Sequence, residues 1–269
     1  MSEQKNASIE EIQKNLLCIF KMIKRIFDEY DIPYFLSYGT LLGAVRHKGF
    51  IPWDDDIDIC VNKKHYEKAM QLLREKLPDY IIVHDKKSNP KYWLPYSQIV
   101  YKHSSSINIE WPENNNHPYT GIGIDIFRFW EEKKYSNKTA KIVSTSIFLQ
   151  NLVTNATAYN GLGRILRFIK YSLLLVLYKA QHLFAPKSRM YCMDPVMLSK
   201  PIMPEDIEAA VFMEFEKMQC SVPKGYDRFL TNEFGNYMEL PPVEERESHY
   251  SVVNIDKNIY EMIDYENYI

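Results

Sequence analysis

The stretch Trp53-Asp-Asp-Asp-Ile-Asp-Ile-Cys60 places a run of aspartates at the start of an apolar segment. We predict a β-strand over residues 54–61, in which alternate side chains point to opposite faces, so that Asp54, Asp56 and Asp58 share one face. Carboxylates crowded on one face repel one another, and a divalent cation that prefers oxygen ligands removes this repulsion. The pattern predicts a metal site, and its alternative is a solvated acidic end of the strand.

A second acidic residue lies inside another apolar segment. The stretch Gly121-Ile-Gly-Ile-Asp-Ile-Phe127 places Asp125 in a predicted strand, where an unpaired carboxylate is costly. If this strand neighbours the first one, Asp125 supplies a further carboxylate to the metal site. The alternative is an aspartate that accepts hydrogen bonds from a nearby backbone turn.

A glycine turn precedes the aspartates. Residues 35–46 read as a strand, a turn at Gly39 and Thr40, and the start of a helix. The free N–H groups at such a helix N-terminus can hold a phosphate, and the Thr40 hydroxyl can add a further contact. Arg46 can clamp phosphate oxygens through its planar guanidinium, or it can simply suit the dipole of a solvated helix end.

The hydrophobic pattern indicates an α+β fold. The segments predicted are helices at 9–30, 41–46 and 64–77, strands at 34–38, 54–61, 80–83, 94–101 and 121–129, and a helical stretch at 137–183. We therefore expect a mixed sheet flanked by helices, with a largely helical second half. Residues 1–135 and 136–269 form the two expected regions, without a linker rich in Gly or Ser between them.

Composition excludes some classes of protein. The formal net charge of -2 argues against a nucleic-acid partner held by bulk electrostatics. The four cysteines show no metal-site or disulfide spacing and predict buried thiols in a reducing compartment. The polar N-terminus does not resemble a signal peptide, so we expect a cytoplasmic protein.

The segment 165–184 bears on the question of a membrane. Its uncharged stretch, residues 171–178, is far shorter than the roughly 20 apolar residues that a spanning helix needs. Basic residues flank or interrupt it. The segment is either a buried helix or a helix that lies on a membrane surface, which would give peripheral contact at the inner face.

Several of these motifs resemble the LicD family, a branch of the nucleotidyltransferase-fold enzymes that also includes fukutin and fukutin-related protein. The resemblance is carried by Ser37-Tyr-Gly-Thr-Leu-Leu-Gly-Ala-Val-Arg46 and by Gly49-Phe-Ile-Pro-Trp-Asp-Asp-Asp-Ile-Asp58. Residues 234–242, followed by Arg246 and His249, are similar to the family's C-terminal signature. The resemblance implies that residues 1–135 are a nucleotidyltransferase-like catalytic core and that residues 136–269 complete the same cleft.

The resemblance also implies an activity. A LicD-type enzyme transfers phosphocholine from CDP-choline to a sugar hydroxyl of a cell-surface glycan or of its lipid-linked precursor, with Mg²⁺ or Mn²⁺ and release of CMP. Relatives use other CDP donors, carrying ribitol or glycerol phosphate, and a nucleotidyltransferase is a further alternative. A scaffold without catalysis would have lost at least one carboxylate, and here all of them are present.

The expected site follows from this assignment. The metal ligands are Asp54, Asp56 and Asp58; the catalytic residues are Asp56, Asp58 and Asp125; and the substrate-binding residues are Gly39, Thr40, Arg46, Trp53, Arg246 and His249. Either Asp125 or His249 is the general base. A choline ammonium favours aromatic rings, for which Tyr38, Trp53, Trp93 and Trp111 are available. The chain departs from the family at Gln98, where a basic residue is expected, and at Arg128, where the family often has a proline after Asp-Ile-Phe.

Overall fold

The computed structural model describes residues 6–92, 94–108, 118–133, 169, 172–173, 176, 189–193 and 203–263. Helix α1 (Ile9–Glu29) begins at a capping box, in which the Ser8 hydroxyl accepts from the Glu11 N–H and the Glu11 carboxylate accepts from the Ser8 N–H. Its apolar face is buried in the core, as the helical spacing predicts.

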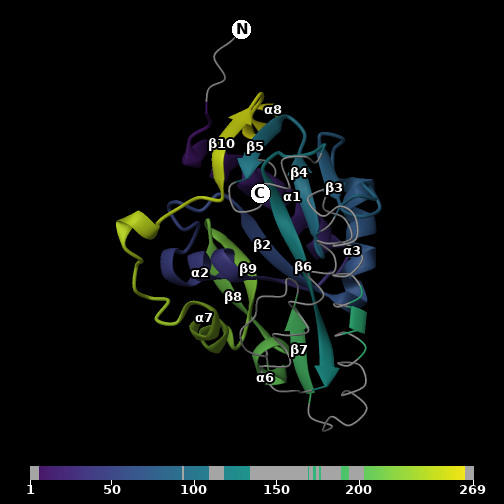
Figure 1. Cartoon of the computed structure of the whole chain (residues 1–269), viewed down its shortest axis with the longest axis vertical. Coiled ribbons are helices and arrows are strands. Elements are labelled where there is room, and N and C mark those ends of the chain that lie inside the picture. Colours follow the sequence, from purple (N-terminus) through teal and green to yellow (C-terminus); the bar gives the residue numbers. More distant parts are fainter. Residues whose placement is uncertain are drawn as a thin grey trace.

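A mixed sheet forms the centre of the molecule (Figure 1), with the strand order β1-β2-β6-β4-β3 and with β7 also paired to β6. The strands are β1 (Tyr34–Leu36), β2 (Ile57–Asn62), β3 (Ile81–His84), β4 (Ser97–Tyr101), β6 (Gly123–Lys133) and β7 (Arg189–Met193). Strands β2 and β6 are parallel, and the other neighbours are antiparallel. The prediction of a mixed sheet in an α+β fold is confirmed.

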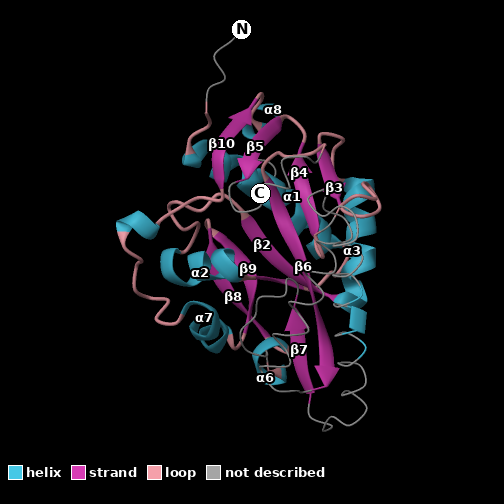
Figure 2. Ribbon diagram, viewed as in Figure 1, coloured by secondary structure: helices cyan, strands magenta, loops and turns pink. Residues whose placement is uncertain are grey.

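Helices cover one face of this sheet (Figure 2). Helix α3 (Lys63–Lys76) contacts α1, β2 and β6, and α1 also contacts β6. The isoleucines Ile57 and Ile59 of β2 and Ile124 and Ile126 of β6 are fully buried. Because side chains alternate along a strand, Asp58 and Asp125 belong to the opposite face. The sheet therefore separates an apolar core from a row of acids.

The described part of residues 136–269 contains strands as well as helices. A hairpin of β8 (Ala210–Phe215) and β9 (Met218–Pro223) packs next to β1, and β10 (Tyr250–Ile255) pairs with β5 (Ser104–Asn108). The remaining elements are α6 (Pro204–Ile207), α7 (Tyr226–Phe234), a 3₁₀ turn (Val243–Glu245) and α8 (Ile259–Met262). A largely helical second half is thus not confirmed. Most of the predicted helical stretch 137–183 lies outside the described residues.

The hairpin could have been predicted from the alternation of its apolar residues. Val211, Met213 and Phe215 stand at every second position, as do Cys220 and Val222 in the other strand. Phe215 and Cys220 are fully buried. The cysteines whose side chains are described, Cys18, Cys60 and Cys220, are buried and form no disulfide with one another, as the sequence predicts.

The strand of the acidic run is shorter than predicted. Strand β2 begins at Ile57 rather than at residue 54, so Asp54 lies in the loop that precedes it. This loop makes other hydrogen bonds: the Asp54 N–H donates to the Ile51 carbonyl at 2.9 Å, and Gln13 of α1 donates to the carbonyls of Ile51 and Asp54. Backbone groups that are used in a turn cannot extend a sheet.

We expect Asn15→Ala to lower the free energy of unfolding by about 1–3 kcal/mol, because it leaves buried backbone groups without a partner. Asn15 is fully buried in α1, accepts from the Ile259 N–H at 2.7 Å and donates to Asn258 at 2.9 Å. Urea unfolding measures the change. Gln71→Ala, which removes an exposed bond to Glu75, serves as the control, and an equally small effect at both positions would contradict the expectation.

Candidate metal and substrate site

Two acids lie side by side on the sheet face opposite α1 and α3. Asp58 of β2 and Asp125 of β6 are register partners in the parallel pair, and Gln98 of β4 is the register partner of Asp125 on the other side. The Gln98 amide donates to the Asp125 carboxylate at 3.0 Å. The two acidic strands are thus neighbours, which is the condition for Asp125 to join the site, and Gln98 provides Asp125 with a neutral partner.

The N-terminus of helix α2 (Tyr38–His47) contacts the strand that carries Asp58. The Thr40 hydroxyl accepts from the Asp58 N–H at 2.7 Å, which fixes the helix start against β2. A Cβ atom at Gly39 would lie only 2.9 Å from the Asp54 carboxylate. The chain needs glycine here because the Asp54 side chain packs directly on its backbone. The glycine turn therefore positions a carboxylate, in addition to its predicted role toward phosphate.

The start of α2 offers unsatisfied polar groups. Its N-cap residue, Ser37, makes no capping hydrogen bond, and the buried Ser37 hydroxyl has no hydrogen-bond partner among the described residues. Tyr38 has a φ of 43°, which is unfavourable for a bulky residue. Backbone strain of this kind is concentrated at functional sites, and uncapped N–H groups at a helix start suit an anion.

Asp55 connects the acidic loop to the C-terminal part of the chain. Its carboxylate, which is almost completely buried, accepts from the backbone N–H groups of His249 and Tyr250 at 3.1 Å and contacts the His249 ring at 3.0 Å. Alternation alone does not identify Asp55 as a site residue. The run of three consecutive aspartates could have indicated a role for Asp55, because a buried aspartate in the middle of such a run also needs a hydrogen-bond partner.

The buried acids influence one another. Burial, and next the charge of Asp56, raise the pKa of Asp54 and of Asp58 well above the ordinary value. The same two causes raise the pKa of Asp125 to about 7. The charge of Asp56 and the hydrogen bond to Asp55 raise the pKa of His249 to about 11. The site thus carries more acidic groups than a dry environment keeps ionised without a cation.

Three of these residues can hold a metal ion. Ligand atoms of Asp54, Asp56 and His249 lie within 4.8 Å of one another. Carboxylates suit Mg²⁺ and Mn²⁺, and an imidazole is acceptable to many divalent ions, so the donor set fits such a cation. The group includes two of the predicted ligands, Asp54 and Asp56. It adds His249, and it does not include Asp58, which lies beside Asp125.

Three of the predicted substrate-binding residues, Arg46, Arg246 and Trp53, lie around the acids and make two contacts. The Arg46 guanidinium donates to the backbone carbonyls of Tyr237 and Glu239 at 2.8 and 3.2 Å. The Arg246 guanidinium lies over the Trp53 ring, 4.9 Å from its centroid. Burial, and next the charge of Arg246, lower the pKa of Arg46. Two guanidiniums that repel one another therefore stand at the rim of the acidic site.

Aromatic side chains extend the row of acids. Phe127 follows Asp125 by two positions in β6 and so shares its face. The Phe127 ring contacts Tyr38 with centroids 5.1 Å apart and Tyr96 with centroids 4.5 Å apart. Of the four aromatic residues proposed from the sequence, Tyr38 and Trp53 lie at the site. Trp93 and Trp111 lie outside the described residues.

The comparisons with known proteins agree with this geometry. Residues 31–154 match the family described as LicD/FKTN/FKRP, nucleotidyltransferase domain. The chain is 25% identical to the lipopolysaccharide cholinephosphotransferase LicD of Haemophilus influenzae, over 91% of this chain and 97% of that protein. The chain is therefore similar to the LicD family, with the family match lying in residues 31–154, where the motifs predict it.

Two further relatives match shorter parts of the chain. The uncharacterized protein RP689 of Rickettsia prowazekii is 31% identical, over 28% of this chain and 36% of its own length. The uncharacterized protein RT0683 of Rickettsia typhi is 37% identical, over 28% of this chain and 25% of its own length.

We expect Gly39→Ala to weaken Mn²⁺ binding about 10-fold or more, because the added methyl group displaces the Asp54 carboxylate from the backbone on which it packs. Isothermal titration calorimetry measures the affinity. Gly225→Ala is the matched control, since its methyl group would meet Asp206 instead and should lower stability alone. Equal Mn²⁺ affinity in the wild type and Gly39→Ala would show that Gly39 does not position a metal ligand.

Proposed function

We propose that this protein transfers phosphocholine from CDP-choline to a sugar hydroxyl of a cell-surface glycan or of its lipid-linked precursor, and releases CMP. The observation that carries the proposal is the similarity over nearly the full length of both chains to a protein named as a lipopolysaccharide cholinephosphotransferase. The cluster of acids on a nucleotidyltransferase-like sheet supports it, since transfer of a phosphoryl group depends on positioning and charge neutralisation.

In the proposed reaction, the acceptor hydroxyl oxygen forms a bond to the phosphorus that carries choline. The bond from this phosphorus to the oxygen shared with CMP breaks, and its electron pair leaves with CMP. Asp125 accepts the hydroxyl proton. It is partly exposed on the sheet face, and its Gln98 partner is neutral, so no fixed cation competes for the carboxylate. The His249 ring, in contrast, is already engaged by Asp55.

Asp54 and Asp56, together with His249, would hold the metal ion, which we propose to be Mg²⁺ or Mn²⁺. When bound, this ion neutralises negative charge on the donor diphosphate and on the departing CMP. Asp58 and Asp125 remain on the sheet face next to it. We propose that Asp58, next to the metal ligands, adds negative charge that attracts the cation, and that Asp125 faces the acceptor.

The remaining substrate contacts are assigned by charge. The uncapped start of α2 at Gly39 and Thr40 suits the donor phosphates. Arg46 and Arg246 add positive charge at the rim, and Trp53 holds Arg246 in position by its ring. In this proposal residues 136–269 complete the cleft that residues 1–135 begin, since Arg46 and Asp55 both bind the segment 237–250.

Incubation with Mg²⁺ and a panel of CDP-choline, CDP-ribitol and CDP-glycerol should give CMP release that is fastest from CDP-choline. Asp56→Asn should remain folded and lower the rate about 10³-fold or more, because a metal ligand is lost. Chromatography of the released nucleotide measures both.

Asp79→Asn, at an exposed turn, is the control for this substitution. Near-normal turnover by Asp56→Asn would exclude the metal site. Faster release from CDP-ribitol or CDP-glycerol would reassign the donor, and release of pyrophosphate from a nucleoside triphosphate would favour nucleotidyl transfer.

The segment 165–184 supports a peripheral contact of the enzyme with the membrane. Its described residues Ile169, Leu173 and Val176 are 55%, 57% and 60% exposed, which does not match a buried helix. Their spacing places them on one face of a helix. The surrounding sequence contributes Arg164, Arg167, Lys170 and Lys179. No helix of the described residues is long and apolar enough to span a membrane.

The wild type should float with vesicles that contain anionic lipids, because apolar side chains with basic neighbours bind the interface of such membranes. The double substitution of Leu173 and Val176 by Glu should reduce the bound fraction about 10-fold or more. Phe212→Glu, at an exposed apolar side chain of β8, serves as the control. Equal flotation of the double variant and the wild type would contradict membrane docking by this segment.

A further inference from the structure

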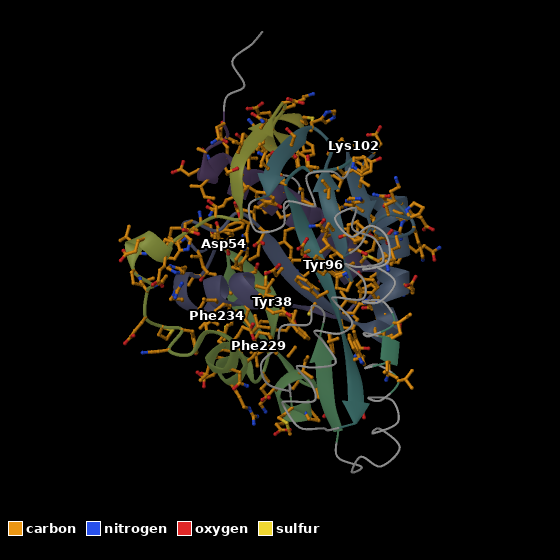
Figure 3. The ribbon with its side chains drawn as sticks, viewed as in Figure 1. Tyr38, Asp54, Tyr96, Lys102, Phe229 and Phe234 are labelled. Atoms are coloured by element: carbon orange, nitrogen blue, oxygen red, sulfur yellow. The ribbon has the colours of Figure 1, made fainter. Side chains whose placement is uncertain are left out.

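Three aromatic rings lie next to the acids, and the proposed roles in metal binding and proton transfer do not involve them. Phe127 is buried between Tyr38 and Tyr96, which are both partly exposed. Figure 3 labels Tyr38, Tyr96 and Asp54 over the central part of the sheet. The planes of Tyr38 and Phe127 are inclined by 76°, and those of Tyr96 and Phe127 by 57°. The three rings therefore form an angled group rather than a flat stack.

We propose that Tyr38, Tyr96 and Phe127 recognise the quaternary ammonium group of the donor, and so select choline over an uncharged alditol. This inference rests on the proposed transfer of phosphocholine. The electron-rich faces of aromatic rings attract a cation, and a trimethylammonium group cannot donate ordinary hydrogen bonds, so several inclined rings are the usual surface for it. An alditol head group would instead need several polar partners for its hydroxyls.

The position of the rings along the sheet fits the length of the donor. Phe127 is two residues beyond Asp125 in β6, a step of about 7 Å in an extended strand. The choline nitrogen is separated from its phosphorus by one oxygen and two carbons. With the reacting phosphorus near Asp125 and the metal ligands, the ammonium group can reach the rings without leaving the sheet face.

The acids add a favourable electric field for a cation. Tyr96 donates a hydrogen bond that favours the ionised form of Asp125, so the hydroxyl end of one ring faces the acid while its ring contacts Phe127. Tyr38 belongs to the start of α2, where the donor phosphates are expected, and its strained backbone fixes the ring next to them. The two tyrosines thus connect the head-group site to the reacting centre.

The experiment compares CDP-choline with its uncharged isostere, in which a tert-butyl group replaces the trimethylammonium group. The two donors have the same shape, so the ratio of their kcat/KM values measures recognition of the charge. Tyr38→Leu and Tyr96→Leu should each lower this ratio about 10-fold or more, because the ring is lost. Tyr38→Phe and Tyr96→Phe retain the ring and should keep the ratio within about 3-fold of the wild type.

Tyr80→Leu is the matched control, since Tyr80 is a partly buried tyrosine that packs on Tyr101, away from the acids. An unchanged ratio in both folded leucine variants would overturn the head-group site while the transferase activity stands. Absence of transfer from CDP-choline by the wild type would overturn the proposed function first, and this inference with it. Tyr38 and Tyr96 are tested separately, so if one leucine variant does not fold, the ratio measured for the other still tests the proposal.

Discussion

The crowding of carboxylates in a largely dry site is the constraint on which the rest of the structure depends. Asp54, Asp58 and Asp125 all have raised pKa values, because burial and the charge of Asp56 oppose their ionisation. Such a cluster is costly to fold, so the fold must hold it rigidly. It holds the acidic segment through three neighbours: the Asp54 side chain packs on the Gly39 backbone, the Asp55 carboxylate accepts from the N–H groups of His249 and Tyr250, and the Asp58 N–H donates to the Thr40 hydroxyl.

This constraint explains the order of the strands. A parallel pair in the middle of the sheet brings Asp58 and Asp125 into register, and the antiparallel neighbour β4 adds Gln98 on the other side. A basic residue in place of Gln98 would form an ion pair with Asp125 and lower its pKa. With an amide there, burial and the charge of Asp56 prevail, and the pKa of Asp125 is raised to about 7. A carboxylate of this kind can accept a proton near neutral pH.

The sequence predicts the parts of the site that depend on short-range pattern. The alternation at Asp58 and Asp125 and the turn at Gly39 follow from local geometry, and the structure pairs them as expected. Short-range sequence pattern does not predict contacts between distant segments. His249 meets Asp55 across 194 positions of the chain, and the bond between Arg46 and Glu239 spans 193. The strand also starts later than alternation suggests, because Gln13 and Ile51 hold the backbone around Asp54 in a turn.

The distribution of charge over the site also bears on its orientation toward the donor. The acids lie at the centre, Arg46 and Arg246 lie at the rim, and the rings of Tyr38, Phe127 and Tyr96 continue along the sheet face. With a cation bound among the acids, a donor that carries a diphosphate and, at one end, an ammonium group would have the complementary sequence of charges. Reversing the donor would bring its ammonium group toward the arginines and leave the rings without a cation. For the proposed donor, electrostatics would therefore favour one direction of binding, with the nucleotide toward the arginines and the head group over the rings.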